Sequence, residues 1–160
     1  MARSDLCSGP TLALLLLGGF RSLVDAATVE LARRGYRDVR PAHDFTMRAI
    51  AGGTDTASAL ARRLGVSKQA AAKTIAVLEQ RGYVARGEDP YDARRRQLEV
   101  TALGLRLLTE WESVFEELRE RWSRLIGPKA LRTLEKQLAV LVGHSPVRLE
   151  YMSDELARRW

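Results

Sequence analysis

The sequence has one cysteine, Cys7, and two histidines among its 160 residues. A single thiol cannot close an internal disulfide, and it cannot supply a cysteine-rich zinc or iron–sulfur site. With so few nitrogen and sulfur ligands, we expect no metal centre and no cofactor. The scarcity of cysteine also agrees with a reducing compartment, and we expect a cytoplasmic location.

Long apolar runs are scarce as well. The longest begins at Leu12, extends to Phe20 and stops at Arg21. A helix that crosses a membrane needs about 20 apolar residues, so we expect no membrane span. A secretory signal is disfavoured, because Asp5 offsets the early positive charge and apolar residues continue past Arg21 at helical spacing.

The motifs of common enzymes are missing too. There is no phosphate-binding G-x-x-x-x-G-K-[ST], no G-x-G-x-x-G after a strand, no H-E-x-x-H and no G-x-S-x-G. We therefore do not expect an enzyme. What the chain does have is positive charge: 26 Lys and Arg against 20 Asp and Glu, a formal charge of +6. This balance indicates an anionic partner, and it favours nucleic acid over a membrane surface.

Helical periodicity covers most of the chain. It predicts helices over residues 11–34 and 41–51, a short one capped by Thr54 or Asp55 and ending at 64, and one capped by Ser67 that runs to Gly82. Further helices are predicted over 102–126 and after Gly127, with a last short one from Ser145 to near Trp160.

The period changes between Gly82 and Thr101. Residues 83–86 and 97–100 alternate between apolar and polar, and turn-forming residues 87–92 and an arginine triplet separate them. This predicts a two-stranded ribbon with a basic tip, in the order of a winged helix-turn-helix. The predicted fold is mainly α with a small two-stranded β-wing. Residues 41–101 would form the DNA-binding domain, and residues 1–40 and 102–160 a helical dimerisation domain.

The helix that starts after Ser67 has the pattern of a DNA-reading helix. Ala71, Ile75 and Leu78 share its core face, and Gln69 and Lys73 lie opposite. Glutamine can bond adenine, lysine can donate to guanine, and the helix start can bind phosphate. An ordinary solvated face is the alternative. The predicted DNA contacts are Arg62, Arg63, Ser67, Lys68, Gln69, Ala72, Lys73, Arg94, Arg95 and Arg96.

In the predicted wing, Asp92 and Arg94 are two residues apart and can pair on one side of an extended segment. An arginine held in this way can enter a narrow minor groove, while its neighbours reach phosphates. A solvated basic turn is the alternative.

The predicted helices at the two ends of the chain carry apolar residues at gaps of three and four, which is typical of helix pairing. An intramolecular bundle is possible, but long seams that flank a small domain favour a homodimer. The predicted dimer contacts are Leu14, Leu17, Phe115, Leu118, Trp122, Leu125, Leu134 and Leu138.

Two segments resemble a known family. Asp89–Arg94, followed by Val100–Gly104, is similar to the D-P-x-D-x-R … L-T-x-x-G wing signature of the multiple-antibiotic-resistance regulator (MarR) family. In this wing signature, Val100 replaces the usual leucine. Residues 60–67 and 78–84 resemble the helix-turn-helix consensus of the same family. The resemblance implies a homodimeric bacterial transcription regulator, usually a repressor, that binds a palindromic operator with Arg94 in the wing.

In many family members a small, often phenolic, effector releases the DNA. The candidates for an effector pocket are His43, Met47 and Trp111, although a tryptophan on such a seam is more often core and His43 more often lies on a helix surface. Peroxide sensors of the family use a cysteine in the first helix. Cys7 precedes that helix, and only Arg3 could lower its pKa, so redox sensing is a minor alternative. A winged helix used only for protein contacts is another.

Overall fold

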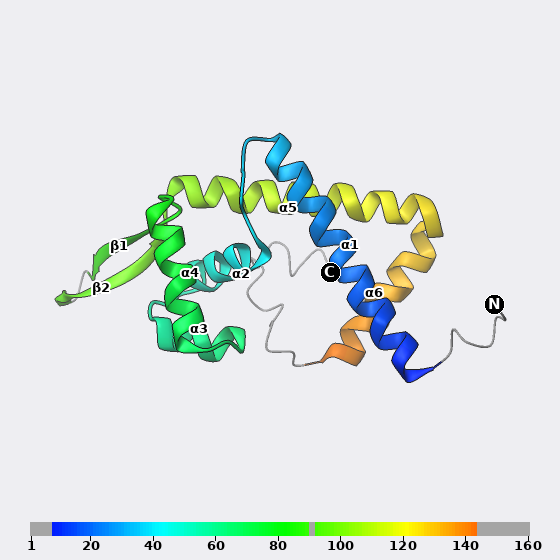
Figure 1. Ribbon diagram of the computed structural model, residues 1–160, viewed down its shortest axis with the longest axis horizontal. Helices are drawn as coiled ribbons and strands as arrows, with labels where there is room; N and C mark the ends of the chain where they lie inside the picture. The colour runs from blue at the N-terminus through cyan, green and yellow to red at the C-terminus, as the bar shows by residue number, and fades with distance from the viewer. Residues whose placement is uncertain (1–7, 90–91, 144–160) are drawn as a thin grey trace.

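The computed structural model describes residues 8–89 and 92–143, and of residues 88, 89 and 92–96 it describes the backbone alone. The molecule is elongated along the helix α5 (Ala102–Ile126) (Figure 1). At one end of α5 lies the winged-helix lobe, which runs from α2 to β2. The helix α1 (Gly9–Arg33) crosses α5 near its middle, and α6 (Pro128–Val142) folds back beneath α5 from its other end. The three helices α1, α5 and α6 are called the stem.

The winged-helix lobe consists of α2 (Pro41–Ala51), α3 (Ala57–Leu64), α4 (Lys68–Gln80), β1 (Val84–Asp89) and β2 (Asp92–Val100). The strands are antiparallel, with Val84 opposite Val100 and Arg86 opposite Leu98. The predicted fold class, mainly α with a two-stranded wing, is confirmed. The bounds of α2 and α5 agree with the prediction residue for residue.

Three details of the prediction were wrong. The cap of α3 is Thr56, whose Oγ1 accepts from Ala59 N at 3.2 Å, rather than Thr54 or Asp55. The helix α1 begins at Gly9, because Ser8 caps it. The ribbon is longer than expected, and the arginine triplet lies within β2 rather than at a tip. Backbone pairing, such as Glu88 with Arg96, extends these strands through residues whose side chains give no alternating pattern. The predicted last helix after Ser145 lies outside the described residues.

One apolar core joins the lobe to the stem. Leu31 of α1, Met47 of α2, Leu78 of α4 and Trp111 of α5 are all fully buried in it. Phe115 stacks on Trp111, with ring centroids 5.3 Å apart and 21° between the planes. The core therefore forms where α2 and α1 pack on opposite parts of α5.

Five residues that were predicted for the dimer contact or an effector pocket lie in or against this core. Leu118 is buried against the chain's own helices and Phe115 packs on the core, so neither is an open dimer contact as placed. His43, Met47 and Trp111 are 6%, 0% and 0% exposed, so they line no open pocket as placed. His43 is also not a helix-surface residue, because it turns inward at the start of α2.

The helix α1 is more apolar than expected. It is 25 residues long, and an 18-residue window of it has a mean hydropathy of 1.6, so by length and composition it could cross a membrane. This overturns the expectation that no segment is long enough. Core helices of soluble proteins and N-terminal signal sequences meet the same criterion. The first half of α1 is not covered by the described part of the chain: Leu14 and Leu15 are 67% and 58% exposed.

Candidate nucleic-acid interface

The helix α4 presents a polar face to solvent. Ala71, Ile75 and Leu78 are buried, as predicted, and anchor the helix on the core. The opposite side is exposed and consists of small or polar residues; this recognition face comprises Gln69, Ala72, Lys73, Ala76 and Gln80. Because its side chains are short or flexible, the face can approach a groove closely and still donate and accept hydrogen bonds there.

The start of α4 is capped by Ser67, whose Oγ accepts from Ala70 N at 3.1 Å. The remaining free amides and the positive end of the helix dipole point outward beside Lys68, which is exposed. This end of the helix can hold a phosphate oxygen by backbone donors and by charge.

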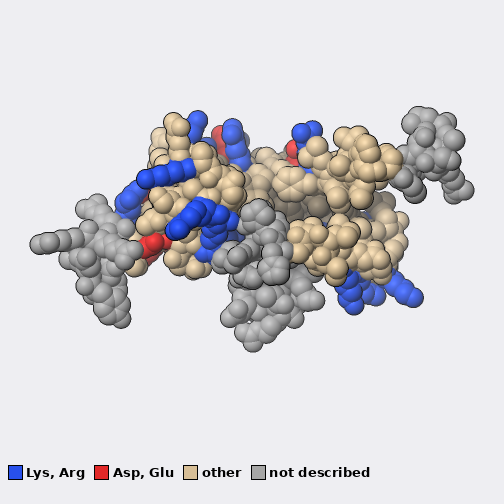
Figure 2. Space-filling view, turned by 90° about the horizontal axis from the view of Figure 1, so that it is seen from below, with Lys and Arg blue, Asp and Glu red and all other residues tan. Residues whose placement is uncertain are grey.

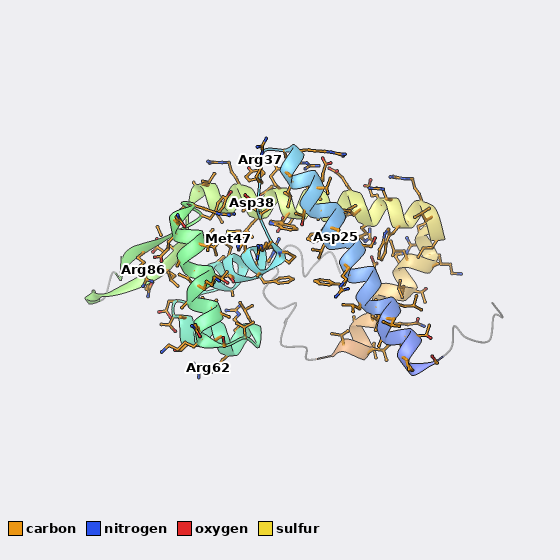
Figure 3. All side chains as sticks on the ribbon, in the orientation of Figure 1. Asp25, Arg37, Asp38, Met47, Arg62 and Arg86 are labelled. Atoms are coloured by element: carbon orange, nitrogen blue, oxygen red, sulfur yellow. The ribbon has the colours of Figure 1, made fainter. Side chains whose placement is uncertain are left out.

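The neighbouring arginines of α3 have different surroundings. Arg62 is exposed at the end of the lobe away from α5 (Figure 3). Arg63 turns inward, where its Nη1 donates to the Ala49 carbonyl at 3.2 Å and to Thr54 Oγ1. The predicted phosphate contact of Arg63 therefore does not fit its placement, because its guanidinium holds the α2–α3 loop together.

The wing leaves the same lobe beside α4. Its strands carry Arg94, Arg95 and Arg96, but these side chains, and the predicted Asp92–Arg94 pair, lie outside the described residues. At the base of the wing, Arg86 Nε bonds Glu79 Oε1 at 2.7 Å, which ties β1 to α4 (Figure 3). The sequence did not predict this pair, because Glu79 lies on a helix and Arg86 on a strand, and neither repeat relates the two positions.

Positive charge gathers on this part of the surface. Seen from below, Lys and Arg side chains cluster over the lobe, while much of the stem is neither basic nor acidic (Figure 2). Among the residues that the structure describes, no group of three His, Cys, Asp or Glu side chains could hold a metal ion.

A buried polar group supports the start of α2. His43 Nδ1 accepts from the backbone N of Arg40 at 3.2 Å, so the neutral imidazole supplies the cap of this helix. Burial, together with the nearby positive charges of Arg81 and Arg40, lowers the pKa of His43 below its ordinary value of 6.5. Arg81 itself donates to the Asp38 carbonyl at 2.8 Å, which fastens the end of α4 to the α1–α2 connection.

Comparison with known proteins agrees with this geometry. A family model described as the MarR family matches residues 45–95, which span most of α2, all of α3, α4 and β1, and the first part of β2. Residues 45–95 are thus similar to the winged helix of the MarR family. The matched segment holds the recognition face and the Ser67 cap on one surface.

Solved structures share the fold over most of the chain. The Streptococcus pneumoniae protein FabT, in complex with DNA, is 19% identical with a TM-score of 0.67, and the match covers 84% of this chain and 94% of that one. The Mycobacterium tuberculosis MarR family protein Rv2887 is 23% identical, with a TM-score of 0.62 and coverages of 85% and 97%.

A third structure, S. aureus MepR bound to ethidium bromide, is 16% identical with a TM-score of 0.56, and the match covers 86% of this chain and 96% of that one. A comparison with curated proteins gave no match. The chain therefore has the fold of MarR-family transcription regulators, with the stem included.

Proposed function

We propose that the protein is a cytoplasmic transcription regulator that binds a palindromic operator in double-stranded DNA as a homodimer. The observation that carries this proposal is the exposed recognition face on a MarR-family winged helix, next to a Ser67-capped helix start. The recognition face would read the major groove, and Lys68 and Arg62 would contact phosphates. Arg94 would enter the minor groove with the wing. The DNA complex of FabT supports this assignment by its fold.

A homodimer accounts for the uncovered apolar surface of the stem. Exposed large apolar side chains gather on α1, on the end of α5 and on α6: Leu12, Leu14, Leu15, Leu16, Leu17, Phe20, Leu125, Ile126, Leu134, Val140, Leu141 and Val142. Soluble monomers rarely expose so large a contiguous apolar surface. A membrane would account for α1 alone, whereas a second copy would cover all three helices. Leu14, Leu17, Leu125 and Leu134 remain proposed contacts, together with Trp122 and Leu138, which are half-buried.

A two-fold dimer would hold two recognition faces about one helical turn of B-DNA, ~34 Å, apart. Analytical ultracentrifugation tests the pairing directly. We expect a dimer, and Leu14→Asp or Leu125→Asp should shift it toward monomer because a charge would be buried in the interface. Leu105→Asp is the matched control, since Leu105 is 52% exposed near the lobe end of α5. A wild-type chain that sediments only as a monomer would contradict the dimer.

DNA binding is tested by titrating the protein against the duplex upstream of its own gene and against a scrambled duplex, each at two salt concentrations. We expect tighter binding to the natural duplex, and binding to both should weaken as salt rises. Lys73→Ala should cost about 1 to 3 kcal/mol on the natural duplex. Lys136→Ala, an exposed lysine of α6, should leave binding unchanged. Equal affinity for both duplexes would refute sequence-specific reading, and a chain that binds neither would favour a protein-contact module.

We also propose a small aromatic effector that releases the DNA. Supporting this, the buried indole N–H of Trp111 donates to no acceptor within the described part of the chain. The ethidium complex of MepR adds support from a protein of the same fold. Because Met47 and Trp111 are closed in, an effector would enter by parting α2 from α5. Thermal shift with ethidium and 4-hydroxybenzoate tests this: a shift lost in Trp111→Phe and kept in Trp122→Phe supports it, and no shift with either compound argues against it.

A further inference from the structure

A bridge of three charged side chains joins the winged-helix lobe to α5. Arg48 of α2 donates from Nε to both carboxylate oxygens of Asp44, at 3.1 and 2.9 Å. Its Nη1 donates to Glu112 Oε1 of α5 at 2.9 Å. One guanidinium therefore bonds a carboxylate of its own helix and a carboxylate of the helix that carries the lobe.

The Asp44–Arg48 end of the bridge lies in the interior, and its Glu112 end reaches the surface. The side chains of Asp44 and Arg48 are 6% and 14% exposed, and that of Glu112 is 35% exposed. Burial raises the pKa of the Asp44 carboxyl, although the Arg48 guanidinium opposes this. A buried ion pair adds little net stability, because desolvation offsets its attraction. The bond from Arg48 to Glu112 joins two helices, and its geometry limits how α2 can pack on α5.

A second cluster of charged side chains on α5 contacts the end of α1 instead of the lobe. Glu110 and Glu117 bond Arg34, the residue that caps the end of α1, at 3.0 and 2.7 Å. Glu112, between them in sequence, bonds α2 instead. The helix α5 is thus fastened separately to the end of α1 through Arg34 and to the lobe through Arg48.

We propose that the Asp44–Arg48–Glu112 bridge fixes the angle at which the lobe is held on α5, and thereby the spacing between operator half-sites that the dimer accepts. The second part rests on the proposed function. Each lobe is carried on α5 and α5 belongs to the stem, so a change of this angle moves the two recognition faces toward or away from each other. Half-site spacing is a geometric property of such dimers, whereas the bases read within a half-site depend on α4 and the wing. Arg48 and Glu112 are therefore positioning residues, which contact no DNA.

Glu112→Ala is the variant that tests the bridge, because it leaves the buried Asp44–Arg48 pair intact and unpairs no buried charge. Glu117→Ala is its matched control: it removes a carboxylate of the same helix from the Arg34 cluster. Spin labels at Gln80→Cys on α4 and Arg132→Cys on α6, in a Cys7→Ser background, report the lobe angle. The labelled chain is diluted with unlabelled chain, so that only distances within one chain are measured.

We expect the distance distribution between the labels to broaden or shift in Glu112→Ala and to stay unchanged in Glu117→Ala. On duplexes with one base pair added or removed between the half-sites, Glu112→Ala should discriminate less than the wild type, by about fivefold. Its preference for natural over scrambled half-sites should be kept. Glu112→Asp, which restores the carboxylate, should recover part of the discrimination.

An unchanged label distribution in Glu112→Ala overturns the proposal, whatever the DNA measurements give. An altered distribution with wild-type spacing discrimination overturns the link to half-site spacing. A wild type that shows no preference among duplexes refutes the proposed function, but the label distances still decide whether the bridge sets the lobe angle.

Discussion

The Thr101 hydroxyl donates to the Gly82 carbonyl oxygen at 2.6 Å, and its Oγ1 accepts from Gly104 N at 3.1 Å. One side chain therefore caps α5 and fastens the turn that ends α4. The Thr101 N–H adds a bond to the Tyr83 carbonyl at 3.0 Å. This corner is where the chain passes from the wing into the stem, and it explains why a threonine followed three residues later by glycine stands at the end of the wing.

Removing the hydroxyl of Thr101 tests this corner. Thr101→Val keeps the shape of the side chain but loses both bonds, so unfolding in urea should require about 1 to 2 kcal/mol less. Thr101→Ser keeps the hydroxyl and should lie close to wild type. If the valine variant matches wild type at the same protein concentration, the cap contributes nothing to stability.

Gly104 has no room for a side chain. A Cβ there would collide with the Tyr83 carbonyl oxygen and would lie 2.7 Å from Val100 Cγ1. Gly104→Ala should therefore destabilise the fold by about 3 kcal/mol, since backbone cannot move aside cheaply. Gly19→Ala is the control, because its Cβ would meet only Trp122 at 3.6 Å, an ordinary contact. Glycine-to-alanine changes inside helices usually stabilise, by about 0.5 to 1 kcal/mol. A Gly104→Ala chain as stable as wild type would show that the backbone at Tyr83 moves away from α5 at little cost.

The lowered pKa of His43 predicts a dependence of stability on pH. Between that lowered pKa and 6.5, the unfolded chain binds more protons at His43 than the folded chain does. Stability should therefore fall as pH drops below about 6.5, since protonation favours the unfolded chain. His43→Asn offers an acceptor to Arg40 N but does not titrate, so its free energy of unfolding should lose this part of the slope. Urea unfolding at several pH values, at one protein concentration, measures both chains; parallel curves would contradict the assignment.

Leu118 and Leu125 separate the core from the proposed interface. Leu118 is 7% exposed and Leu125 is 80% exposed within the chain. Leu118→Ala should cost about 2 to 5 kcal/mol in unfolding free energy at any protein concentration, because it leaves a cavity. Leu125→Ala should leave the fold intact and weaken the dimer, as sedimentation at decreasing concentration would reveal. Equal effects of the two changes would contradict the assignment of Leu118 to the core and of Leu125 to the dimer interface.

Arg62 and Arg63 are neighbours with different predicted losses. Arg62→Ala should reduce the dependence of log K on log salt by about one unit, because one phosphate contact is lost. Arg63→Ala should reduce thermal stability instead, since it frees Thr54 and the Ala49 carbonyl inside the lobe. If Arg63→Ala changes the dependence of log K on log salt while the chain stays fully folded, Arg63 contacts DNA after all.

Local patterns predicted the fold well, because caps and periods act over a few residues. The start of α2 at Pro41, the Ser67 cap of α4 and the length of α5 all follow from such signals. The buried and exposed sides of α4 were predicted for the same reason: one helix wheel decides them. The spacing of four residues between the opposite charges of Asp44 and Arg48 is typical of an ion pair on one helix. Nothing in the sequence indicates that this pair is buried or that it bonds α5.

What failed depended on contacts distant in sequence. A three–four seam does not say whether its partner is another copy or the same chain, so Phe115 and Leu118 were assigned outward when they pack inward. Arg62 and Arg63 look alike in sequence, and only the α2–α3 loop decides which one turns in. The wing arginines joined β2 because strand pairing is set by the opposing backbone, which a period search does not detect.

The uncovered leucines of α1 have a consequence for how the protein is made. This helix leaves the ribosome before α5 and α6 exist, and Leu14 remains 67% exposed even after they fold. Under the proposed dimer, each newly synthesised chain exposes this apolar helix until two copies meet, and such exposure favours aggregation and proteolysis. At low cellular concentration the chains would then be degraded before they could pair, so little functional protein would accumulate until synthesis exceeds this loss.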